Sequence, residues 1–330
     1  MPLDPQIRDI IRRCNEWDTL HGPSRSVEDE RRRIAGIRAS VWKPEMLPVR
    51  SIENISVPGA EGPIAVRVYR PEQDGPVPTV VYLHGGGWSV GGLDSHETHA
   101  RRIANRAGAV VVAVDYRLAP EHRFPAGYED CVAAYRWALD HIGDLGGDLA
   151  RLGVAGDSAG GNLAAAVALL ARDEGLPLAA QLLIYPATDM TTVYPSMRKL
   201  ASGYFLAIDP EAEQGAGYLS SPDQRSDPRA SPLLADLTGV APAVVVVAEF
   251  DPIKDQGIAF AEKLQEAGTT VIYRHFPGLI HSFASIGASR AAVEASNTFC
   301  EDLAVLLNRR PVPRPAANAP SGQGRTSGGL

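Results

Sequence analysis

Short apolar runs alternate with amphipathic stretches through the middle of this 330-residue chain. Most of the runs are rich in Val, Ile and Leu, which is typical of strands buried on both faces of a parallel sheet. Turn-forming residues at 58–63 separate the first two runs and favour an antiparallel hairpin there. The strands that we expect cover residues 51–57, 64–69, 80–83, 110–115, 152–155, 181–185, 243–248 and 270–276.

Amphipathic stretches follow most of these strands and predict helices. The expected helices cover residues 95–107, 127–139, 162–172, 253–267 and 289–307. Alternating strands and helices predict an α/β fold with a mostly parallel, eight-stranded sheet flanked by helices. The apolar face of residues 289–307 could cover the sheet or pair with a second copy, so a homodimer stays open.

Two regions interrupt the alternation. Residues 1–45 are amphipathic and Arg-rich, and residues 188–230 contain a Pro-, Ser- and Asp-rich run. They could be surface loops, but we expect helical segments that pack together as a cap above the sheet. The main domain then comprises residues 46–187 and 231–310. Residues 311–330 are rich in Pro, Ala, Gly and Ser without an apolar run, and we expect a disordered tail.

Composition and charge narrow the class of protein. The chain is 45% hydrophobic and 22% charged, as in soluble globular proteins. A net charge of −7 argues against a nucleic-acid partner. No apolar run approaches the roughly 18 residues of a membrane span, and the charged N-terminus lacks a signal-peptide core. Cys14, Cys131 and Cys300 lie far apart, which favours buried thiols in a reducing cytoplasm.

The sequence Gly156-Asp157-Ser158-Ala159-Gly160 matches the GxSxG pattern between an expected strand and an expected helix. A serine on such a tight turn projects its hydroxyl above the sheet, and small neighbours are needed around it. The helix that follows favours negative charge developing near the serine. Ser158 is therefore the candidate nucleophile. A plain glycine-rich turn is the alternative.

A second glycine-rich stretch, His84-Gly85-Gly86-Gly87, follows the expected strand at 80–83. Acyl transfer needs backbone N–H donors that are fixed before the oxyanion forms, and glycines let successive amides face the site. We expect the oxyanion hole to consist of the amides of Gly85, Gly86 and Ala159. His84 is expected to hold the loop by hydrogen bonds and to transfer no proton.

The other members of a catalytic triad should follow the serine in the order acid, then histidine. His275 falls inside the last expected strand, whereas His281 falls in the loop that we expect after it, and is the candidate base. Asp251 is the candidate acid because it follows the strand at 243–248. Glu249 is expected to lie still in that strand, and Asp255 to be an early-helix charge that serves as the fallback.

Other chemistries were weighed against these motifs. The stretch around Ser158 does not contain GxGxxG, and GxxxxGK[ST] occurs nowhere in the chain. His96 and His99 are one residue short of the spacing in HExxH, so we interpret them as solvated helix residues. No metal and no cofactor is expected.

Several blocks in this order resemble the bacterial hormone-sensitive-lipase-like esterases (family IV) of the α/β-hydrolase fold. The likeness spans roughly residues 40–305. The blocks that carry it are HGGGW (84–88), DYRLAPEHRFPA (115–126), GDSAGGNLA (156–164), YPATD (185–189), GYF (203–205), ASPLLADL (230–237), AEFDPIKDQG (248–257) and GLIHSF (278–283).

The resemblance implies a cofactor-free carboxylic ester hydrolase that acts on short to medium acyl chains. It assigns the triad to Ser158, Asp251 and His281, and it also implies a cap. Ser282 stands where such sequences often have glycine, and the resemblance does not explain the residues beyond 310. Lactonases, deacetylases and amidases use the same machinery, and a binding protein on this fold would typically lack the serine or the histidine.

Three aromatic residues are candidates for the substrate pocket: Trp88, Tyr204 and Phe205. Ordinary core packing is the alternative for each of them. In the block at 115–126, we expect Asp115, Arg117 and Glu121 to form a charged network that fixes a loop near the site. The Arg-, Asp- and Ser-rich cap segments argue against a long-chain lipase, which needs a large apolar entrance.

Overall fold

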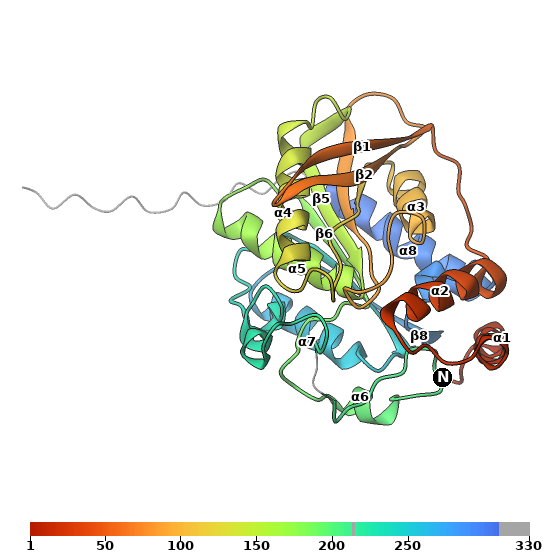
Figure 1. Cartoon of the computed structure of the whole chain (residues 1–330). Coiled ribbons are helices and arrows are strands. Elements are labelled where there is room, and N and C mark those ends of the chain that lie inside the picture. The colour runs from red at the N-terminus through yellow and green to blue at the C-terminus, as the bar shows by residue number, and fades with distance from the viewer. Residues whose placement is uncertain (213–214, 310–330) are drawn as a thin grey trace, which may run out of the picture.

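The computed structural model describes residues 1–212 and 215–309. Its strands form one sheet in the order β1-β2-β4-β3-β5-β6-β7-β8 (Figure 1). β1 and β2 form an antiparallel hairpin, β2 is antiparallel to β4, and the remaining neighbours are parallel. The strands are β1 (Ser51–Gly59), β2 (Gly62–Arg70), β3 (Val77–Leu83), β4 (Val110–Val114), β5 (Gly147–Asp157), β6 (Ala180–Ile184), β7 (Ala243–Phe250) and β8 (Val271–Ile280).

Each expected strand is present, and the mostly parallel α/β sheet is confirmed. Two boundaries differ from the prediction more than the others do. β5 begins at Gly147, five residues before the expected start at residue 152, and its first five residues are partly or fully exposed. β8 continues through Pro277 and Gly278 to Ile280, where we expected a loop. The proposed tail at 311–330 lies outside the described residues.

Two apolar clusters cover the two faces of the sheet. One contains residues of α3 (Glu97–Ala107) and α8 (Arg290–Leu307). The other contains residues of α4 (Ala126–Asp140), α5 (Ala159–Asp173) and α7 (Lys254–Glu266). Thus α8 turns its apolar face to the sheet. No helix in the described part of the chain is long and apolar enough to cross a membrane.

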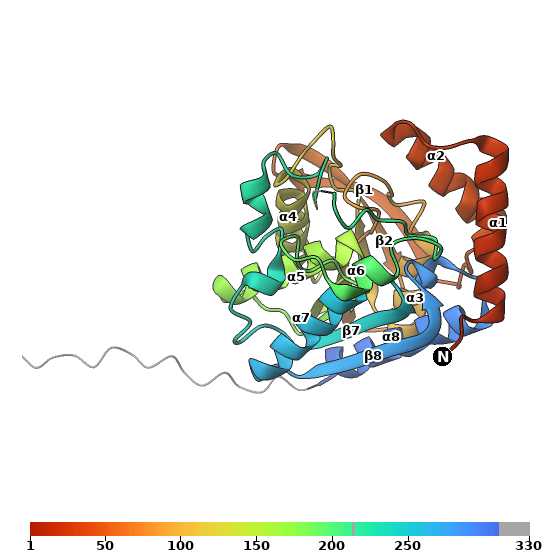
Figure 2. The same ribbon diagram turned by 90° about the horizontal axis from the view of Figure 1, so that it is seen from below.

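The N-terminal region forms α1 (Pro5–His21) and α2 (Val27–Ile37), followed by a short π-helical turn, η1 (Arg38–Trp42). Asp4 caps α1 and Ser26 caps α2, because each side chain accepts a first-turn backbone N–H. Both views show α1 and α2 together at one side of the molecule, away from α4 (Figures 1 and 2).

The region at 188–230 is less helical than we expected. It contains the five-residue helix α6 (Pro195–Lys199) and the 3₁₀ turn η2 (Pro222–Ser226), and its other described residues are irregular. Frequent Pro, Gly, Ser and Asp residues explain this, since they favour turns over helix. The region contacts the N-terminal segment through Phe205, whose ring lies 4.8 Å from that of Trp42.

Candidate active site

Ser158 occupies a sharp turn between β5 and α5. Its backbone has φ 54° and ψ −117°, a conformation that L-residues seldom adopt. The turn needs glycine on both sides. A Cβ on Gly156 would lie 2.1 Å from the carbonyl oxygen of Gly160, and one on Gly160 would lie 2.0 Å from that of Leu83. The small residues of the GxSxG pattern therefore allow the close packing that exposes the serine.

We expect Gly160→Ala to destabilise the protein by about 3 kcal/mol, because its methyl group must displace backbone rather than a flexible side chain. Gly143→Ala is the matched control, since a Cβ there meets nothing within 4 Å. Urea unfolding of both variants and the wild type measures the difference. Equal stability of the two variants would contradict the packing argument.

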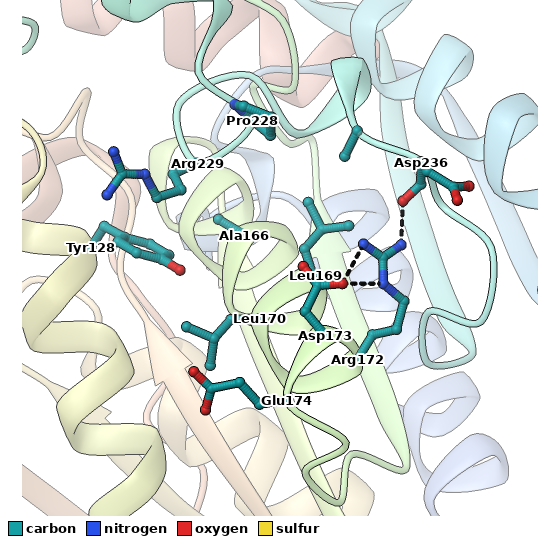
Figure 3. Close-up of a pocket in the computed structure, with 11 residues that line it drawn as sticks. Tyr128, Ala166, Leu169, Leu170, Arg172, Asp173, Glu174, Pro228, Arg229 and Asp236 are labelled. Atoms are coloured by element: carbon teal, nitrogen blue, oxygen red, sulfur yellow. Dashed lines mark hydrogen bonds and ion pairs between the residues drawn. The ribbon is translucent and has the colours of Figure 1, made fainter. Parts of the chain in front are cut away.

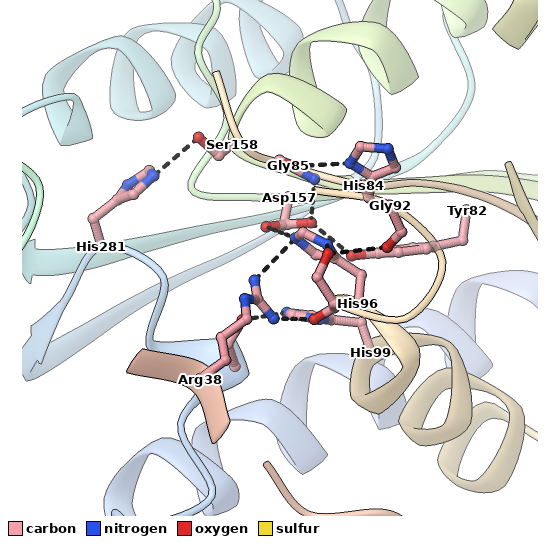
Figure 4. Close-up of polar contacts among 12 residues, drawn as sticks. Arg38, Tyr82, His84, Gly85, Gly92, His96, His99, Asp157, Ser158 and His281 are labelled. Carbon is pink, nitrogen blue, oxygen red and sulfur yellow. Dashed lines mark hydrogen bonds and ion pairs between the residues drawn. The ribbon is translucent and has the colours of Figure 1, made fainter. Parts of the chain in front are cut away.

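A hydrogen-bonded series connects three side chains from different loops. The Oγ of Ser158 lies 2.9 Å from Nε2 of His281, and Nδ1 of His281 lies 2.7 Å from Oδ2 of Asp251 (Figure 4 shows the first contact). Asp251 is fully buried, and its Oδ1 accepts the backbone N–H of Ile253 at 2.9 Å. The hydroxyl, imidazole and carboxylate thus have the arrangement of a nucleophile, a base and an orienting acid.

The alternative carboxylates lie elsewhere. Glu249 belongs to β7, as expected, and its Oε2 accepts the N–H of Gly278. Asp255 lies in the first turn of α7, as expected, and its Oδ2 accepts the N–H of Ser196 at 2.8 Å. His275 belongs to β8. Asp251 is therefore the carboxylate that meets His281.

The expected oxyanion hole needs a correction. The N–H of Gly85 donates to Oδ1 of Asp157 at 2.8 Å, so this amide is turned away from an oxyanion at Ser158. The sequence pattern could not reveal this, because the two residues are 72 positions apart. Gly86 and Gly87, with φ of 122° and 58°, adopt backbone conformations that favour glycine. Ala159 is the first residue of α5, where an N–H has no partner within the helix.

His84, His96 and His99 lie together in the interior, so the expectation that His96 and His99 are solvated was wrong. Burial lowers the pKa of His84 and of His99 to about 3. Burial and the nearby Arg38 also lower the pKa of His96. Nδ1 of His84 lies 2.8 Å from the carbonyl oxygen of Gly85, in agreement with its expected part in holding the loop. In the described ranges, no group of three or more His, Cys, Asp or Glu residues is placed to hold a metal.

The candidate pocket residues lie in two separate groups. Trp88 stacks on Tyr218, with ring centroids 4.4 Å apart. Tyr204 stacks on Phe250 at 5.1 Å, and Phe205 packs against the N-terminal segment. The three residues are thus not one cluster, although each of them packs against buried apolar residues.

The expected network of Asp115, Arg117 and Glu121 is also wrong. Arg117 pairs with Asp130 at 2.8 Å, and Glu121 pairs with Arg31 of α2 at 2.8 Å. Their closeness in the sequence predicts that the three residues pair with one another. In the fold, Arg117 instead meets Asp130 of α4, and Glu121 meets Arg31 of the N-terminal region.

A hollow of about 470 Å³ lies on the outer side of α5, and no triad residue lines it (Figure 3). Leu169 and Leu170 lie at its base. Arg172 beside it donates to Asp173 and to the carbonyl oxygen of Asp236. Glu174 and Arg229, which also line the hollow, pair with Arg136 and Asp227 outside it, and we assign no chemistry to the hollow.

Comparisons with known proteins agree with this fold and geometry. The model of a family with the alpha/beta hydrolase fold matches residues 80–285. Two proteins of Mycobacterium tuberculosis are each 44% identical to the chain. The carboxylic ester hydrolase LipN aligns over 71% of this chain and 65% of its own length, and the carboxylesterase NlhH over 79% and 85%. A hyperthermophilic esterase from Pyrobaculum calidifontis superposes with a TM-score of 0.87 at 38% identity, covering 92% of this chain and 99% of that one.

The sheet, the turn at Ser158 and the family match define the class as an enzyme of the α/β-hydrolase fold. Within it, the chain belongs to the hormone-sensitive-lipase-like, family IV carboxylesterases. It is a carboxylic ester hydrolase.

Proposed function

We propose that the protein hydrolyses short- to medium-chain carboxylic esters through an acyl-enzyme on Ser158. The observation that carries this proposal is the hydrogen-bonded series Asp251–His281–Ser158, with contacts of 2.7 and 2.9 Å. We assign oxyanion stabilisation to Gly86, Gly87 and Ala159. Gly85 is left out because its N–H is bound to Asp157.

The reaction that we propose has two halves. Nε2 of His281 takes the hydroxyl proton as Oγ of Ser158 bonds to the ester carbonyl carbon, and the carbonyl oxygen becomes the oxyanion. His281 then gives that proton to the alcohol oxygen as the bond between this oxygen and the carbonyl carbon breaks. The alcohol departs, and the acyl group remains bonded to Oγ of Ser158 as the acyl-enzyme. In the second half His281 deprotonates a water molecule, whose oxygen attacks the acyl carbon. The carboxylic acid leaves and Ser158 regains its proton.

Hydrolysis of p-nitrophenyl esters from acetate to palmitate tests the substrate class. We expect kcat/KM to peak at short or medium chains and to fall by about tenfold or more at palmitate, because the covering segments are polar and partly exposed. Matched anilides and lactones, assayed in parallel, test the amidase, deacetylase and lactonase alternatives. Higher kcat/KM on an anilide or a lactone than on every ester would contradict the proposed substrate class. No turnover of any substrate would favour a binding protein.

We also propose that residues 1–45 and 188–230 form a cap over the catalytic domain, comprising 46–187 and 231–310. The contact of Trp42 with Phe205 supports this division. The candidates for the substrate pocket remain Trp88 in one group and Tyr204 and Phe205 in the other.

A reducing cytoplasmic location is supported by three cysteines that are buried and free. For the homodimer we propose no surface, because α8 packs its apolar face on the sheet.

A further inference from the structure

A buried carboxylate lies directly beside the nucleophile and is not a member of the triad. Asp157 precedes Ser158 and is 3% exposed. Its Oδ1 accepts the hydroxyl of Tyr82 at 2.6 Å and the N–H of Gly85 at 2.8 Å (Figure 4). Asp157 therefore fixes the orientation of the Gly85 peptide. The amides of Gly86 and Gly87 follow in the same tight loop, so their directions depend on this bond.

The charge of Asp157 requires compensation in the interior, since an isolated buried carboxylate is strongly disfavoured. Burial opposes its ionisation, yet the neighbouring His96 and the hydroxyl of Tyr82 hold the pKa of Asp157 well below its usual range. His84 and His99 are neutral near pH 7 because burial lowers the pKa of each to about 3. His84 and His99 therefore bring no positive charge to Asp157 near pH 7.

Arg38 brings that charge from the N-terminal segment. The side chain is 8% exposed and belongs to η1, 119 positions before Asp157. Its NH2 lies 3.2 Å from Nε2 of His96, and this Nε2 lies 3.6 Å from Oδ2 of Asp157. Its NH1 donates to the carbonyl oxygen of Ser95. The single Nε2 either accepts from Arg38 or faces Asp157 as a donor, so the guanidinium acts on the carboxylate by its charge across the His96 ring (Figure 4).

The N-terminal segment also contacts the loop that contains the HGGGW block (84–88) at a second place. Nε of Arg31, in α2, donates to the carbonyl oxygen of Ser89 at 2.9 Å, just after the HGGGW block. On its outer side, the guanidinium of Arg38 lies 5.2 Å from the ring of Trp42, which in turn contacts Phe205. The N-terminal segment is therefore bound both to the loop with the oxyanion donors and to the region at 188–230.

We propose that Arg38 is a positioning residue for the oxyanion hole. Its positive charge, close to the His96 ring that adjoins Asp157, stabilises the Asp157 carboxylate, and Asp157 holds the Gly85 peptide so that the amides of Gly86 and Gly87 face the reacting carbonyl. The proposal rests on the function proposed above. Arg38 touches no substrate, and its effect belongs to the tetrahedral intermediate rather than to ground-state binding.

The test measures binding of a transition-state analogue. A trifluoromethyl ketone adds to Ser158 and leaves its oxygen as an oxyanion, whereas the corresponding methyl amide resembles the bound substrate. We compare the wild type with Arg38→Met and Arg38→Lys. The matched control is Arg32→Met, which removes a charge from α2 at a side chain that is 71% exposed and pairs with Asp29.

For Arg38→Met we expect kcat on p-nitrophenyl butyrate to fall by about tenfold and the ketone to bind about tenfold more weakly, since a lost oxyanion donor costs about 10²–10³ in rate and this change only loosens the donors. KM and the binding of the amide should stay within about twofold. Arg38→Lys should recover most of the loss because it restores the charge. Arg32→Met should match the wild type.

Equal ketone binding in wild type and folded Arg38→Met would overturn the inference, as would a loss of ketone and amide binding by the same factor. If Arg38→Met does not fold, Arg38→Gln, which also removes the charge, is measured in the wild type and in Asp157→Asn. A smaller effect in Asp157→Asn supports action through the carboxylate, and additive effects overturn it. A wild type that neither cleaves esters nor binds the ketone would instead contradict the proposed function.

Discussion

Ser158→Ala should lower kcat for p-nitrophenyl butyrate by on the order of ten-thousand-fold or more, because no acyl-enzyme can form without the hydroxyl. The variant should keep the fold, since Ser158 is partly exposed and the change removes a single oxygen, whose hydrogen-bond partner is Nε2 of His281 at 2.9 Å. Residual hydrolysis would come from the oxyanion donors and from binding alone.

A covalent probe separates loss of the nucleophile from loss of the site. A fluorophosphonate should add one phosphonyl group per wild-type chain, detected by intact mass, and none to Ser158→Ala. Ser202→Ala is the matched control because Ser202 is exposed in the region at 188–230. It should react and turn over as the wild type does. Labelling or full activity in Ser158→Ala would remove Ser158 as the nucleophile, and the proposed mechanism with it.

The sheet could be predicted from the sequence because its strands are nearly continuous apolar runs. β4 is Val-Val-Val-Ala-Val and fully buried, and a short run that is so rich in β-branched residues favours a buried strand over a helix. β8 shows where this reasoning stops. Its last residues include Pro277 and Gly278, which predict a loop, but β8 is an edge strand and can accommodate proline.

The triad order could be predicted for a similar reason. In a parallel sheet the ends of neighbouring strands meet at one edge, so residues after β5, β7 and β8 converge. Ser158, Asp251 and His281 each follow one of those strands. The order of the motifs along the chain and the topology of the sheet therefore predict the same three residues. In the structure these side chains are hydrogen-bonded to one another, as expected.

The interior beneath the nucleophile could not be predicted in this way. His96 and His99 were interpreted as solvated because their spacing failed the metal motif, yet they are 4% and 3% exposed. His96 lies beside Arg38 and Asp157, and His99 lies 3.5 Å from the hydroxyl of Ser285, but no periodic pattern predicts contacts between residues so far apart. The same limit led us to count Gly85 among the oxyanion donors. Buried polar groups must find partners, but the sequence alone does not say which.

The second large effect concerns the acid. Asp251→Asn should lower kcat by about a thousandfold or more, with KM changed little. An asparagine amide donates to Nδ1 of His281, which moves the imidazole proton to Nε2. That nitrogen then cannot accept the proton of Ser158. Asp255→Asn is the matched control, because this carboxylate accepts the N–H of Ser196 and lies outside the series.

The sequence leaves two candidate carboxylates for the acid, Asp251 and Asp255, and we expect their asparagine variants to differ in kcat. Asp255→Asn should retain kcat within about twofold, since an amide oxygen still accepts the N–H of Ser196. Asp251→Asn also keeps an oxygen for the N–H of Ile253, so the loop should stay in place and the loss should come from the wrong imidazole tautomer. Crystal structures of both variants check that His281 has not moved. A larger loss in Asp255→Asn would reverse the assignment, and near-normal turnover in Asp251→Asn would mean that His281 needs no buried carboxylate to act as the base.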